Sequence, residues 1–403
     1  MDWNDNDQQA AFRKQASEFI EKELPPRYHT DQLGPETWSE DRHSPEPERQ
    51  EYSKQWVSAL ASRGWIAPGW PKEYGGGGLT SMEQFILNHE LAKHNAPMVG
   101  GQEISQIGPA IIIHGSDDLK KEHLSRILTG ETNWCQGFSE PGAGSDLASL
   151  TTRAVRDGDE YVINGQKIWT SNAHHAEWIA LLVRTDPDAP KHRGISFLLV
   201  DMKTPGVSVR PLVNMAWDHH FNETFFEDVH VPVKNRVGDE NRGWYVSVTL
   251  MDFERSRIRQ AVSARRHFNK IADYLKTDDG KKKSRHGELS SLRLELADRF
   301  IETEIAFNMA LRVVSMQSRG IVPNYEASML QLSIFETNQR TARSEARLYG
   351  MFSNIWDGES QWAARGGEAI HSYVSSVSAT IAGGSAEIQR NVIATRGLGL
   401  PRG

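Results

Sequence analysis

The sequence predicts an α+β fold in which a strand-rich domain lies between two helical domains. Apolar residues recur at helical spacing in the first third of the chain. Short β-branched runs separated by turn residues fill the middle, and helical spacing returns from about Gly243 to the end. With 403 residues, the chain is too long for one simple core. We therefore expect three domains, at residues 1–132, 133–240 and 241–403.

Turn residues and charge mark the expected breaks in the two helical domains. In the first, the breaks are Pro25-Pro26, the polar stretch 30–47 and Gly75 to Gly78. In the last, periodic stretches run over residues 246–275, 289–317, 326–348 and 386–395. The basic run 281–286 is expected to be a solvated loop, because short charge runs are usually exposed, and a nucleic-acid patch is the alternative.

The middle domain is expected to consist of strands. Runs such as 179–183 and 195–200 are apolar and bounded by turn residues. Asn164-Gly165 lies between two further runs, 161–163 and 166–169. An Asn-Gly pair favours the positive φ angles of a two-residue type I′ turn, so we predict a β-hairpin centred on it.

Composition argues against several classes of protein. The net charge of −7 is unfavourable for general nucleic-acid binding. No apolar run is long enough to cross a bilayer, and the acidic start lacks the features of a signal or transit peptide. The single cysteine, Cys135, allows no intrachain disulfide and no cysteine zinc cluster, and no metal site is expected. We therefore expect a cytoplasmic protein with Cys135 as a small buried hydrophobe.

A glycine-rich segment from Ser139 to Asp146 is the first candidate site. Gly142, Gly144 and Ser145 would let a ligand approach the backbone and its N–H groups. The segment is not a dinucleotide-binding fingerprint, since no strand, turn and helix with an acidic follower surround it. A tight structural turn is the alternative interpretation.

Trp169 and Ser171 are the second candidate. Two residues apart on a strand, they would point to the same side. They would then offer the stacking face and the donor that a flat heteroaromatic cofactor needs. A core tryptophan beside a turn serine is the alternative.

Gly383, Gly384 and Ser385 are the third candidate, directly before an expected helix. N–H groups at the start of a helix suit a phosphate or a carbonyl oxygen. An ordinary serine cap after a glycine turn is the alternative.

The chain resembles the acyl-CoA dehydrogenase family in three blocks that share its order and spacing. These are Phe138-Ser-Glu-Pro-Gly-Ala-Gly-Ser-Asp146, Asn164-Gly-Gln-Lys-Ile-Trp169 and Gly383-Gly-Ser-Ala-Glu-Ile-Gln-Arg390. Residues 75–80 and 107–115 are also similar, so the resemblance covers nearly the whole chain. It is strongest to the bacterial branch that acts on bulky or unusual acyl chains, including steroid side chains.

The resemblance implies an N-terminal helical domain, a β-barrel domain and a C-terminal four-helix bundle, with FAD between the last two and tetramers as the usual assembly. Carried over residue by residue, it places Phe138 and Ser139 at the pyrimidine edge of the flavin. It places Trp169 and Ser171 at the ring and its N5 region. The residues implied to contact CoA are Ser145, Met251 and Asp252. Those implied to approach the FAD phosphates and ribose are Ser385 and Glu387.

The family reaction requires a carboxylate that removes the α-proton of the thioester while a hydride leaves the β-carbon. Many members place that glutamate where this chain has Gly383, whose backbone N–H can only help to polarise the carbonyl. A second family solution uses a helix of the C-terminal domain, which here implies Glu254 as the base and Arg255 as a tuning residue. A surface ion pair between Glu254 and Arg257 is the alternative. Glu140 lies in a loop whose glutamate has no such role in the family.

Some family features are missing from the sequence. Stretches 276–285 and 352–367 do not match the segments that hold FAD across a subunit interface, and Gln136 replaces a frequent aromatic residue. We favour an active dehydrogenase, a homotetramer or heterotetramer that passes electrons to an electron-transfer flavoprotein. The relocated base indicates a branched or bulky acyl group. A silent subunit of a heteromer and a flavin oxidase or monooxygenase on the same fold are the alternatives.

Overall fold

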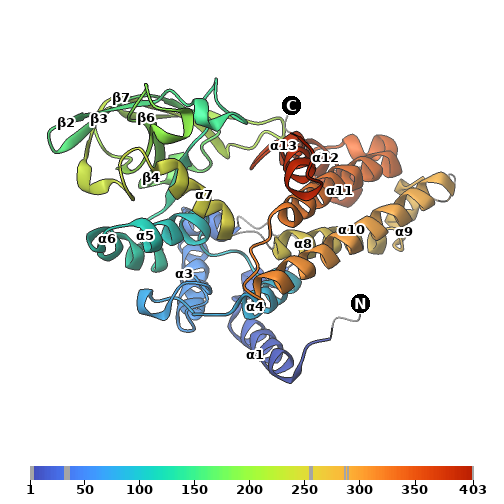
Figure 1. Cartoon of the computed structure of the whole chain (residues 1–403). Helices are drawn as coiled ribbons and strands as arrows, with labels where there is room; N and C mark the ends of the chain where they lie inside the picture. Colours follow the sequence, from blue (N-terminus) through green and yellow to red (C-terminus); the bar gives the residue numbers. More distant parts are fainter. Residues whose placement is uncertain (1–3, 31–36, 254–256, 286, 288–289, 402–403) are drawn as a thin grey trace. The chain divides into compact units, whose positions relative to one another are not determined.

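A computed structural model describes residues 4–30, 37–253, 257–285, 287 and 290–401 (Figure 1). The chain forms two compact units. The first is drawn from the described parts of 1–20, 81–94 and 255–403, and the second from those of 21–80 and 95–254. Helices precede and follow one set of strands along the chain, which confirms the predicted α+β class.

The second unit is built around one curled seven-stranded sheet (Figure 1). Its strands are β1 (Trp134–Gly137), β2 (Arg153–Asp157), β3 (Glu160–Lys167), β4 (Trp178–Arg184), β5 (Ile195–Asp201), β6 (Val207–Leu212) and β7 (Phe221–Pro232). The strand order is β1-β4-β2-β3-β7-β6, and β5 pairs with β4. The β1–β4 and β2–β4 pairs are parallel and the others are antiparallel.

Both faces of the β4–β5 pair are buried, which explains the apolar runs at 179–183 and 195–200. Side chains alternate between two cores, as the two-residue period of a strand requires. Ala180, Leu182 and Phe197 pack in one core with α5 (Gly108–His114), α6 (Asp117–Leu128) and α7 (Gly243–Phe253). Alternate residues such as Leu181 and Leu198 pack in the other core with β3 and β7.

The predicted hairpin at Asn164-Gly165 is wrong, because β3 runs through both residues. The β2–β3 hairpin instead turns at Gly158, which has a φ of 59°. Asn164 exchanges two 2.9 Å hydrogen bonds with Asp228 at an irregularity in the β3–β7 pairing. A Cβ on Gly165 would lie 2.7 Å from Cα of Thr152, so crowding rather than a turn requires the glycine.

The second unit also contains α2 (Thr37–Arg42) and α3 (Pro47–Ala61), so the polar stretch 30–47 is not a continuous break as expected. The first unit contains most of α1 (Asp7–Glu23), together with α4 (Ser81–Lys93), α8 (Ile258–Tyr274), α9 (Asp278–Lys283), α10 (Ser290–Gln317), α11 (Tyr325–Tyr349), α12 (Glu368–Ala379) and α13 (Ala386–Val392). One apolar core joins α4, α8, α10 and α11. The predicted continuous stretch 246–275 is therefore divided between α7 and α8.

The basic run at 281–286 is only partly the solvated loop that we expected. Its first three lysines belong to α9. Lys283 is buried and donates to the Ala363 carbonyl at 3.1 Å and to Oδ2 of Asp279 at 2.9 Å. Part of the run is therefore committed to helix contacts.

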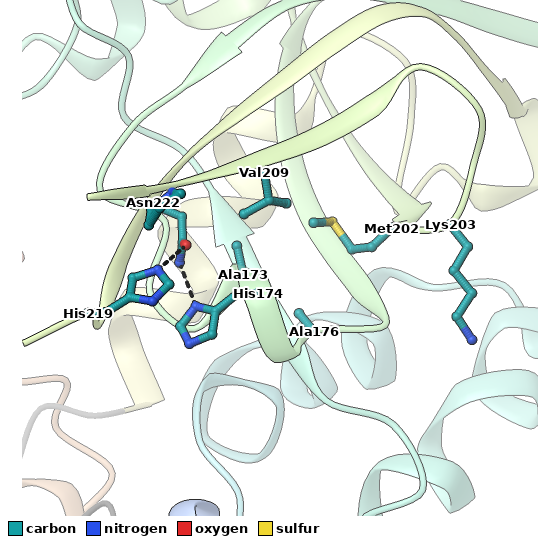
Figure 2. A pocket seen from close by; sticks show the side chains of 9 residues that line it. Ala173, His174, Ala176, Met202, Lys203, Val209, His219 and Asn222 are labelled. Atoms are coloured by element: carbon teal, nitrogen blue, oxygen red, sulfur yellow. Dashed lines mark hydrogen bonds between the residues drawn. The ribbon is translucent and has the colours of Figure 1, made fainter. Parts of the chain in front are cut away.

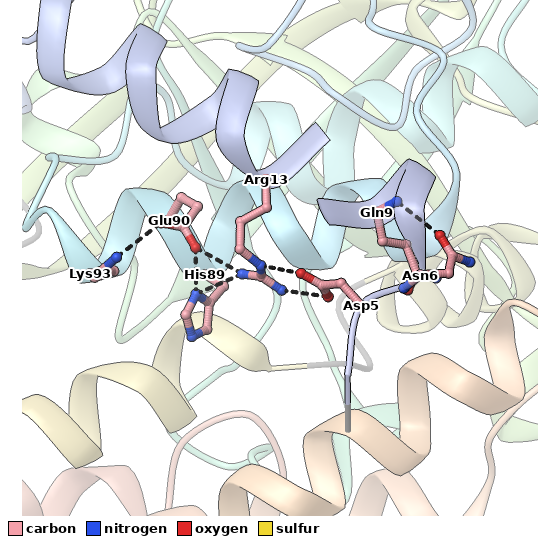
Figure 3. Close-up of polar contacts among 7 residues, drawn as sticks. All are labelled: Asp5, Asn6, Gln9, Arg13, His89, Glu90 and Lys93. Atoms are coloured by element: carbon pink, nitrogen blue, oxygen red, sulfur yellow. Dashed lines mark hydrogen bonds and ion pairs between the residues drawn. The ribbon is translucent and has the colours of Figure 1, made fainter. Parts of the chain in front are cut away.

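An ion-pair cluster joins the start of the chain to α4 in the first unit (Figure 3). Arg13 contacts both carboxylate oxygens of Asp5, at 2.5 and 3.0 Å, and Oε1 of Glu90, at 2.8 Å. Lys93 and His89 also lie within 3.6 Å of the Glu90 carboxylate. Burial raises the pKa of Glu90, but His89 and Arg13 outweigh burial and lower it to about 2.

In the described part of the chain, no helix combines the length and the apolarity that a bilayer crossing requires. Within the same residues, no three His, Cys, Asp or Glu side chains are grouped so that they could hold a metal ion.

Candidate active site

A buried ion pair locks two loops of the second unit together. Nζ of Lys167, the last residue of β3, donates to Oε1 of Glu140 at 2.8 Å and to the Phe138 carbonyl at 3.1 Å. The Ile168 N–H donates to the Ser139 carbonyl at 3.0 Å. The Lys167 and Glu140 side chains are 0% and 5% exposed. The first two candidate blocks are therefore brought side by side.

The Glu140 carboxylate is fully engaged in this lock. Oε2 accepts the N–H and the hydroxyl of Thr151 at 2.7 and 2.9 Å, and Oε1 accepts the Thr152 N–H at 2.8 Å. Burial raises the pKa of Glu140, but Lys167 outweighs burial and the pKa falls to about 2. So weak a base is unsuited to removing an α-proton, which agrees with a purely structural role for Glu140.

The glycine-rich loop turns immediately after Glu140. Glu140 and Ala143 exchange two backbone hydrogen bonds of 3.0 Å, so Pro141 and Gly142 form the tip of a tight turn. A Cβ at Gly142 or Gly144 would meet nothing within 4 Å. Neighbouring residues of this chain would therefore tolerate a side chain at either position. The open space leaves room for a ligand beside the backbone. Ser145 is exposed on the same loop.

Trp169 lies beyond the end of β3, so the expectation that it shares a strand face with Ser171 is wrong. Its φ is 60°, a left-handed conformation that a strand does not contain. Three hydrogen bonds hold the turn against β7 and the residue before it. The Thr170 N–H donates to the Asn222 carbonyl at 3.0 Å, and Nδ2 of Asn222 donates to the Thr170 carbonyl at 3.1 Å. The Asn172 N–H donates to the His220 carbonyl at 2.9 Å.

The left-handed turn presents an exposed indole beside two free hydroxyls. The Trp169 side chain is 55% exposed and contacts Phe221 edge-on, with ring centroids 5.8 Å apart. Ser139 and Ser171 are half-buried, and no hydrogen bond to either hydroxyl is formed within the described residues. A stacking face with nearby donors fits the ring system of FAD, so the residues present match the cofactor that the resemblance implies.

Histidines surround the Asn222 side chain that holds this turn (Figure 2). Nδ2 of Asn222 lies 3.0 Å from Nδ1 of His174, and its Oδ1 lies 2.9 Å from Nε2 of His219. Burial, with the neighbouring histidines His175 and His219, lowers the pKa of His174 to about 4. His174 is therefore neutral near pH 7, and its Nδ1 can accept the Asn222 proton. The adjoining depression of about 350 Å³ is lined by none of the predicted site residues.

The third candidate block forms a glycine turn in the first unit. Gly383 and Gly384 have φ angles of 64° and 94°. The Ser385 hydroxyl accepts the Ile388 N–H at 3.4 Å, so Ser385 caps α13, while a cofactor role for the same turn stays a prediction. Glu387 is exposed, and its own backbone N–H and the Ser385 hydroxyl lower its pKa.

Sequence reasoning missed Gln331, a buried residue of α11 that contacts this turn. Its Nε2 donates to the Gly383 carbonyl at 3.0 Å and to the Gly384 carbonyl at 3.3 Å. Gln331 is 52 and 53 residues from its two glycine partners in the sequence, and no local motif marks the glutamine. Asn222 was missed for the same reason, whereas Lys167 lies inside one of the three blocks but was given no role.

The remaining predicted residues lie at or beyond the end of α7. Met251 and Asp252 belong to the last turn of that helix. The proposed base Glu254 and its neighbour Arg255 lie outside the described residues. The described sites are thus the pair of loops at 138–145 and 167–172 in the second unit and the turn at 383–387 in the first.

Comparison with known proteins places the chain in a family. Models of three acyl-CoA dehydrogenase domains match in chain order: the N-terminal domain at residues 6–131, the middle domain at 135–229 and the C-terminal domain at 241–398. Acyl-CoA dehydrogenase FadE26 of Mycobacterium tuberculosis is 35% identical over 356 residues, which cover 87% of this chain and 88% of FadE26. The chain therefore belongs to the acyl-CoA dehydrogenase family and is an FAD-dependent enzyme.

Solved structures show the same architecture. The structure described as "Tcur3481-Tcur3483 steroid ACAD" has a TM-score of 0.85 and 31% identity, and each chain is covered completely. The ChsE4-ChsE5 complex from Mycobacterium tuberculosis has a TM-score of 0.79 and 32% identity, again with complete coverage of both chains. These matches confirm the three-part arrangement of helical, strand and helical domains.

Proposed function

We propose that this chain dehydrogenates the Cα–Cβ bond of an acyl-CoA thioester, with Glu254 as the base that removes the α-proton. The strongest support is the arrangement of loops 138–145 and 167–172, which the Glu140–Lys167 ion pair holds together. Their arrangement exposes the Trp169 indole beside the Ser139 and Ser171 hydroxyls. FAD, when bound, supplies the acceptor for the hydride that leaves the β-carbon. The products are the trans-2-enoyl-CoA and the two-electron-reduced cofactor.

Each remaining site residue has a binding role in this proposal. Phe138 and Ser139 meet the pyrimidine edge of the flavin, and Trp169 and Ser171 meet its ring. Ser385 and Glu387 approach the FAD phosphates and ribose. The residues proposed to contact the CoA arm are Ser145, Met251 and Asp252. The proposed domains for these roles remain 1–132, 133–240 and 241–403.

Glu254 is the favoured base because the two other candidate positions are unsuitable. Gly383 has no side chain to accept a proton, although its N–H can help to polarise the thioester carbonyl. Glu140 is tied to Lys167 and has a pKa of about 2. An α-proton is only weakly acidic, so the base must be a carboxylate in a dry pocket with a raised pKa. Arg255, beside it in the sequence, tunes its charge.

The test is anaerobic mixing of acyl-CoA with the FAD-loaded Glu254→Gln variant. We expect the visible flavin absorption to persist in this variant and to bleach in the parent protein. Glu240→Gln is the matched control, since Glu240 is a partly exposed ion-pair partner of Arg156 and Arg236. Full bleaching of Glu254→Gln would show that another group is the base.

The proposed substrate is a bulky or branched acyl-CoA, such as a steroid side-chain thioester. Relocation of the base to another helix supports this, as does the word "steroid" in the name of the Tcur3481-Tcur3483 relative. A panel of short, long, branched and steroid-type acyl-CoAs tests it through the rate of flavin bleaching. Preference for plain medium chains would contradict the substrate proposal while leaving the dehydrogenase itself intact.

The proposed assembly is a homotetramer or heterotetramer. α10 exposes Leu294, Ile301 and Ile305 at helical spacing, with exposures between 50% and 70%. α12 and the residues after it expose Tyr373, Val377 and Ile381, while Ala369 is the one fully buried residue of α12. Uncovered apolar stripes on two helices favour burial against further chains.

A heteromer is favoured by the names of two solved relatives, each of which joins two different chains. In that case the second chain completes the FAD site where segments 276–285 and 352–367 lack the family motifs. A catalytically weak or silent role for this chain is the competing candidate, and the glycine at 383 and the missing interface motifs favour it. Light scattering of this chain alone, with and without FAD, tests the assembly. The Glu254→Gln experiment separates the active role from the silent one.

Two further parts of the proposal concern the surroundings of the enzyme. Electrons leave the reduced cofactor to an electron-transfer flavoprotein, and the location is cytoplasmic. Slow return of the visible flavin absorption when the reduced enzyme meets air, with rapid turnover on added electron-transfer flavoprotein, would distinguish this dehydrogenase from an oxidase or monooxygenase.

A further inference from the structure

Two glutamine side chains meet on a largely apolar face of the second unit. Nε2 of Gln136, on β1, donates to Oε1 of Gln106 at 2.6 Å. Gln106 belongs to η3 (Glu103–Ile107), a short π-helix directly before α5. Short π-helical segments are rare and frequently lie at functional sites. The contact joins such a segment to the strand that leads to Phe138.

The alternation of side chains along β1 shows which face Gln136 occupies. Trp134 and Phe138 pack in the core with α5, α6 and α7, whereas Cys135 packs in the other core. Because successive side chains of a strand point to opposite faces, Gln136 shares the face of Trp134 and Phe138. Ala180, its register partner on β4, packs in that same core. An amide therefore interrupts an apolar row, two residues before the residue proposed to meet the flavin edge.

The same face also borders α7, the helix whose last turn carries the proposed CoA contacts. Trp244 and Val246 of α7 pack in this core together with Ile104 and Ile107 of η3. The two helices η3 and α7 are in direct contact. Phe138, η3 and α7 therefore border one apolar face, and the two amides are polar groups on it.

The Gln136 amide is only partly satisfied within the chain. A glutamine offers two N–H donors and one carbonyl oxygen that accepts hydrogen bonds. Among the described residues, Gln136 forms a side-chain hydrogen bond only to Gln106, so its Oε1 accepts no donor. Gln136 is half-buried, which leaves that oxygen open to a ligand. A polar group on an apolar face costs free energy unless it is paired, and a hydroxyl donor would offset that cost.

We propose that Gln136, oriented by Gln106, determines substrate specificity by binding a hydroxyl group on the acyl chain. Oε1 of Gln136 accepts the hydroxyl proton, while apolar neighbours such as Ile104 and Phe138 contact the carbon skeleton. The substrate class is therefore a hydroxylated acyl-CoA, with the hydroxyl beyond the two carbons that react. The inference rests on the proposed function, because it takes the acyl chain to lie beside Phe138 and the flavin.

The test compares CoA thioesters of one carbon skeleton that differ only in a hydroxyl group. The skeleton is either unsubstituted or carries the hydroxyl at successive carbons beyond Cβ. The 2-enoyl-CoA forms are used, so that binding is measured without turnover, and calorimetry on the FAD-loaded protein gives each Kd. We expect the best hydroxylated member to bind about tenfold more tightly than the unsubstituted one, because only the hydroxyl pairs with Oε1 of Gln136.

Gln136→Met should abolish this preference in a way that damage to the fold would not. Met has a similar length and no amide, so the hydroxylated member should bind about tenfold more weakly than it binds the parent. The unsubstituted member should bind at least as tightly, because no unpaired amide faces it. Gln166→Met is the matched control, since Gln166 is a half-buried glutamine of β3 in the same sheet that donates to Glu223 at 2.9 Å. Its preference should equal that of the parent.

Gln106→Met removes the group that orients Gln136 and should reduce the preference by a smaller factor. It decides the question if Gln136→Met fails to fold. Equal affinity of the parent for every member of the series would overturn the hydroxyl subsite, and Gln136 would then be an amide that only water satisfies. An unchanged preference in both variants would overturn the assignment to these two residues. Failure of any acyl-CoA to bleach the parent flavin would contradict the proposed function, while the Kd values would still decide whether Gln136 binds a hydroxyl.

Discussion

Nζ of Lys167 lies 2.8 Å from Oε1 of Glu140, and neither side chain has appreciable contact with solvent. The pair joins the end of β3 to the loop after β1, the two segments that carry the proposed flavin contacts. Burial lowers the pKa of Lys167 to about 8, while Lys167 in turn holds that of Glu140 at about 2. Both groups are therefore charged at neutral pH and depend on each other for stability.

We predict that Lys167→Met destabilises the protein by about 3–5 kcal/mol, because it leaves the Glu140 carboxylate buried without its counter-charge. Urea unfolding at pH 7 measures this. Lys191→Met is the matched control, since Lys191 pairs with Asp146 in the same region at 2.8 Å with both side chains about 60% exposed. Exposed pairs contribute less than about 1 kcal/mol, so the control should unfold near the parent midpoint.

The same ion pair also predicts an effect of Lys167→Met on FAD affinity. Lys167 also holds the Phe138 carbonyl, so the variant should lose affinity for FAD even where it remains folded. Equal unfolding midpoints for Lys167→Met and Lys191→Met would contradict a structural role for the buried pair.

Trp169→Ala is expected to weaken FAD binding by about tenfold, because an exposed indole loses its stacking contact with the flavin. Fluorescence titration of the apoprotein with FAD measures the change. Trp217→Ala is the control: Trp217 is 80% exposed and has a φ of 65°, so both substitutions truncate an exposed indole at a left-handed position. If the two variants bound FAD equally well, Trp169 would have no part in the flavin site.

The order of elements could be predicted because each segment carries its own periodicity. β4 and β5 are buried on both faces and read as apolar runs, and the long helices α10 and α11 follow their predicted stretches closely. The prediction of a hairpin at Asn164-Gly165 was wrong because contacts with residues distant in the sequence outweighed the local turn signal. Thr152 leaves no room for a Cβ at position 165, and Asp228 uses the Asn164 side chain to bridge an irregular pairing.

The candidate site was predictable only where its residues form contiguous blocks. Phe138, Ser139 and Trp169 lie in such blocks, and the structure brings the blocks together. Gln331 acts through partners 52 to 74 residues away, and nothing in its local sequence distinguishes it from an ordinary polar residue. Lys167 lies inside one of these blocks, but its pairing with Glu140, 27 residues away, could not be predicted from that block. The left-handed turn at Trp169 was missed because the periodicity of a strand does not show where the strand ends.

The last prediction concerns His123, which is fully buried in the core of the second unit. Neither ring nitrogen has a hydrogen-bond partner among the described residues. Trp134 and Trp178 contact the imidazole edge-on, with ring centroids 5.1 and 4.6 Å away. Burial lowers its pKa from 6.5 to about 4, because a charged imidazole between two indoles would have no solvation.

The sign of the pH dependence follows from this shift. Between pH 6.5 and about 4, the unfolded state binds a proton at His123 that the folded state does not bind, so stability falls as the pH is lowered through this window. The full effect is roughly 3 kcal/mol, at 1.36 kcal/mol per pKa unit. His123→Leu keeps the apolar contacts and has no proton to bind. Its unfolding free energy should therefore decline less steeply than that of the parent between pH 6.5 and 4.

Urea midpoints measured at half-unit steps from pH 4 to pH 8 test this prediction. His230→Leu is the control, because His230 is exposed on β7 and pairs with the equally exposed Glu160. Its profile should run parallel to that of the parent, since the carboxylates that titrate in the same range are unchanged. If the stability of His123→Leu depended on pH as that of the parent does, the buried imidazole would bind its proton in the folded state as readily as in the unfolded state. Trp134 and Trp178 would then have to move apart and let water reach it.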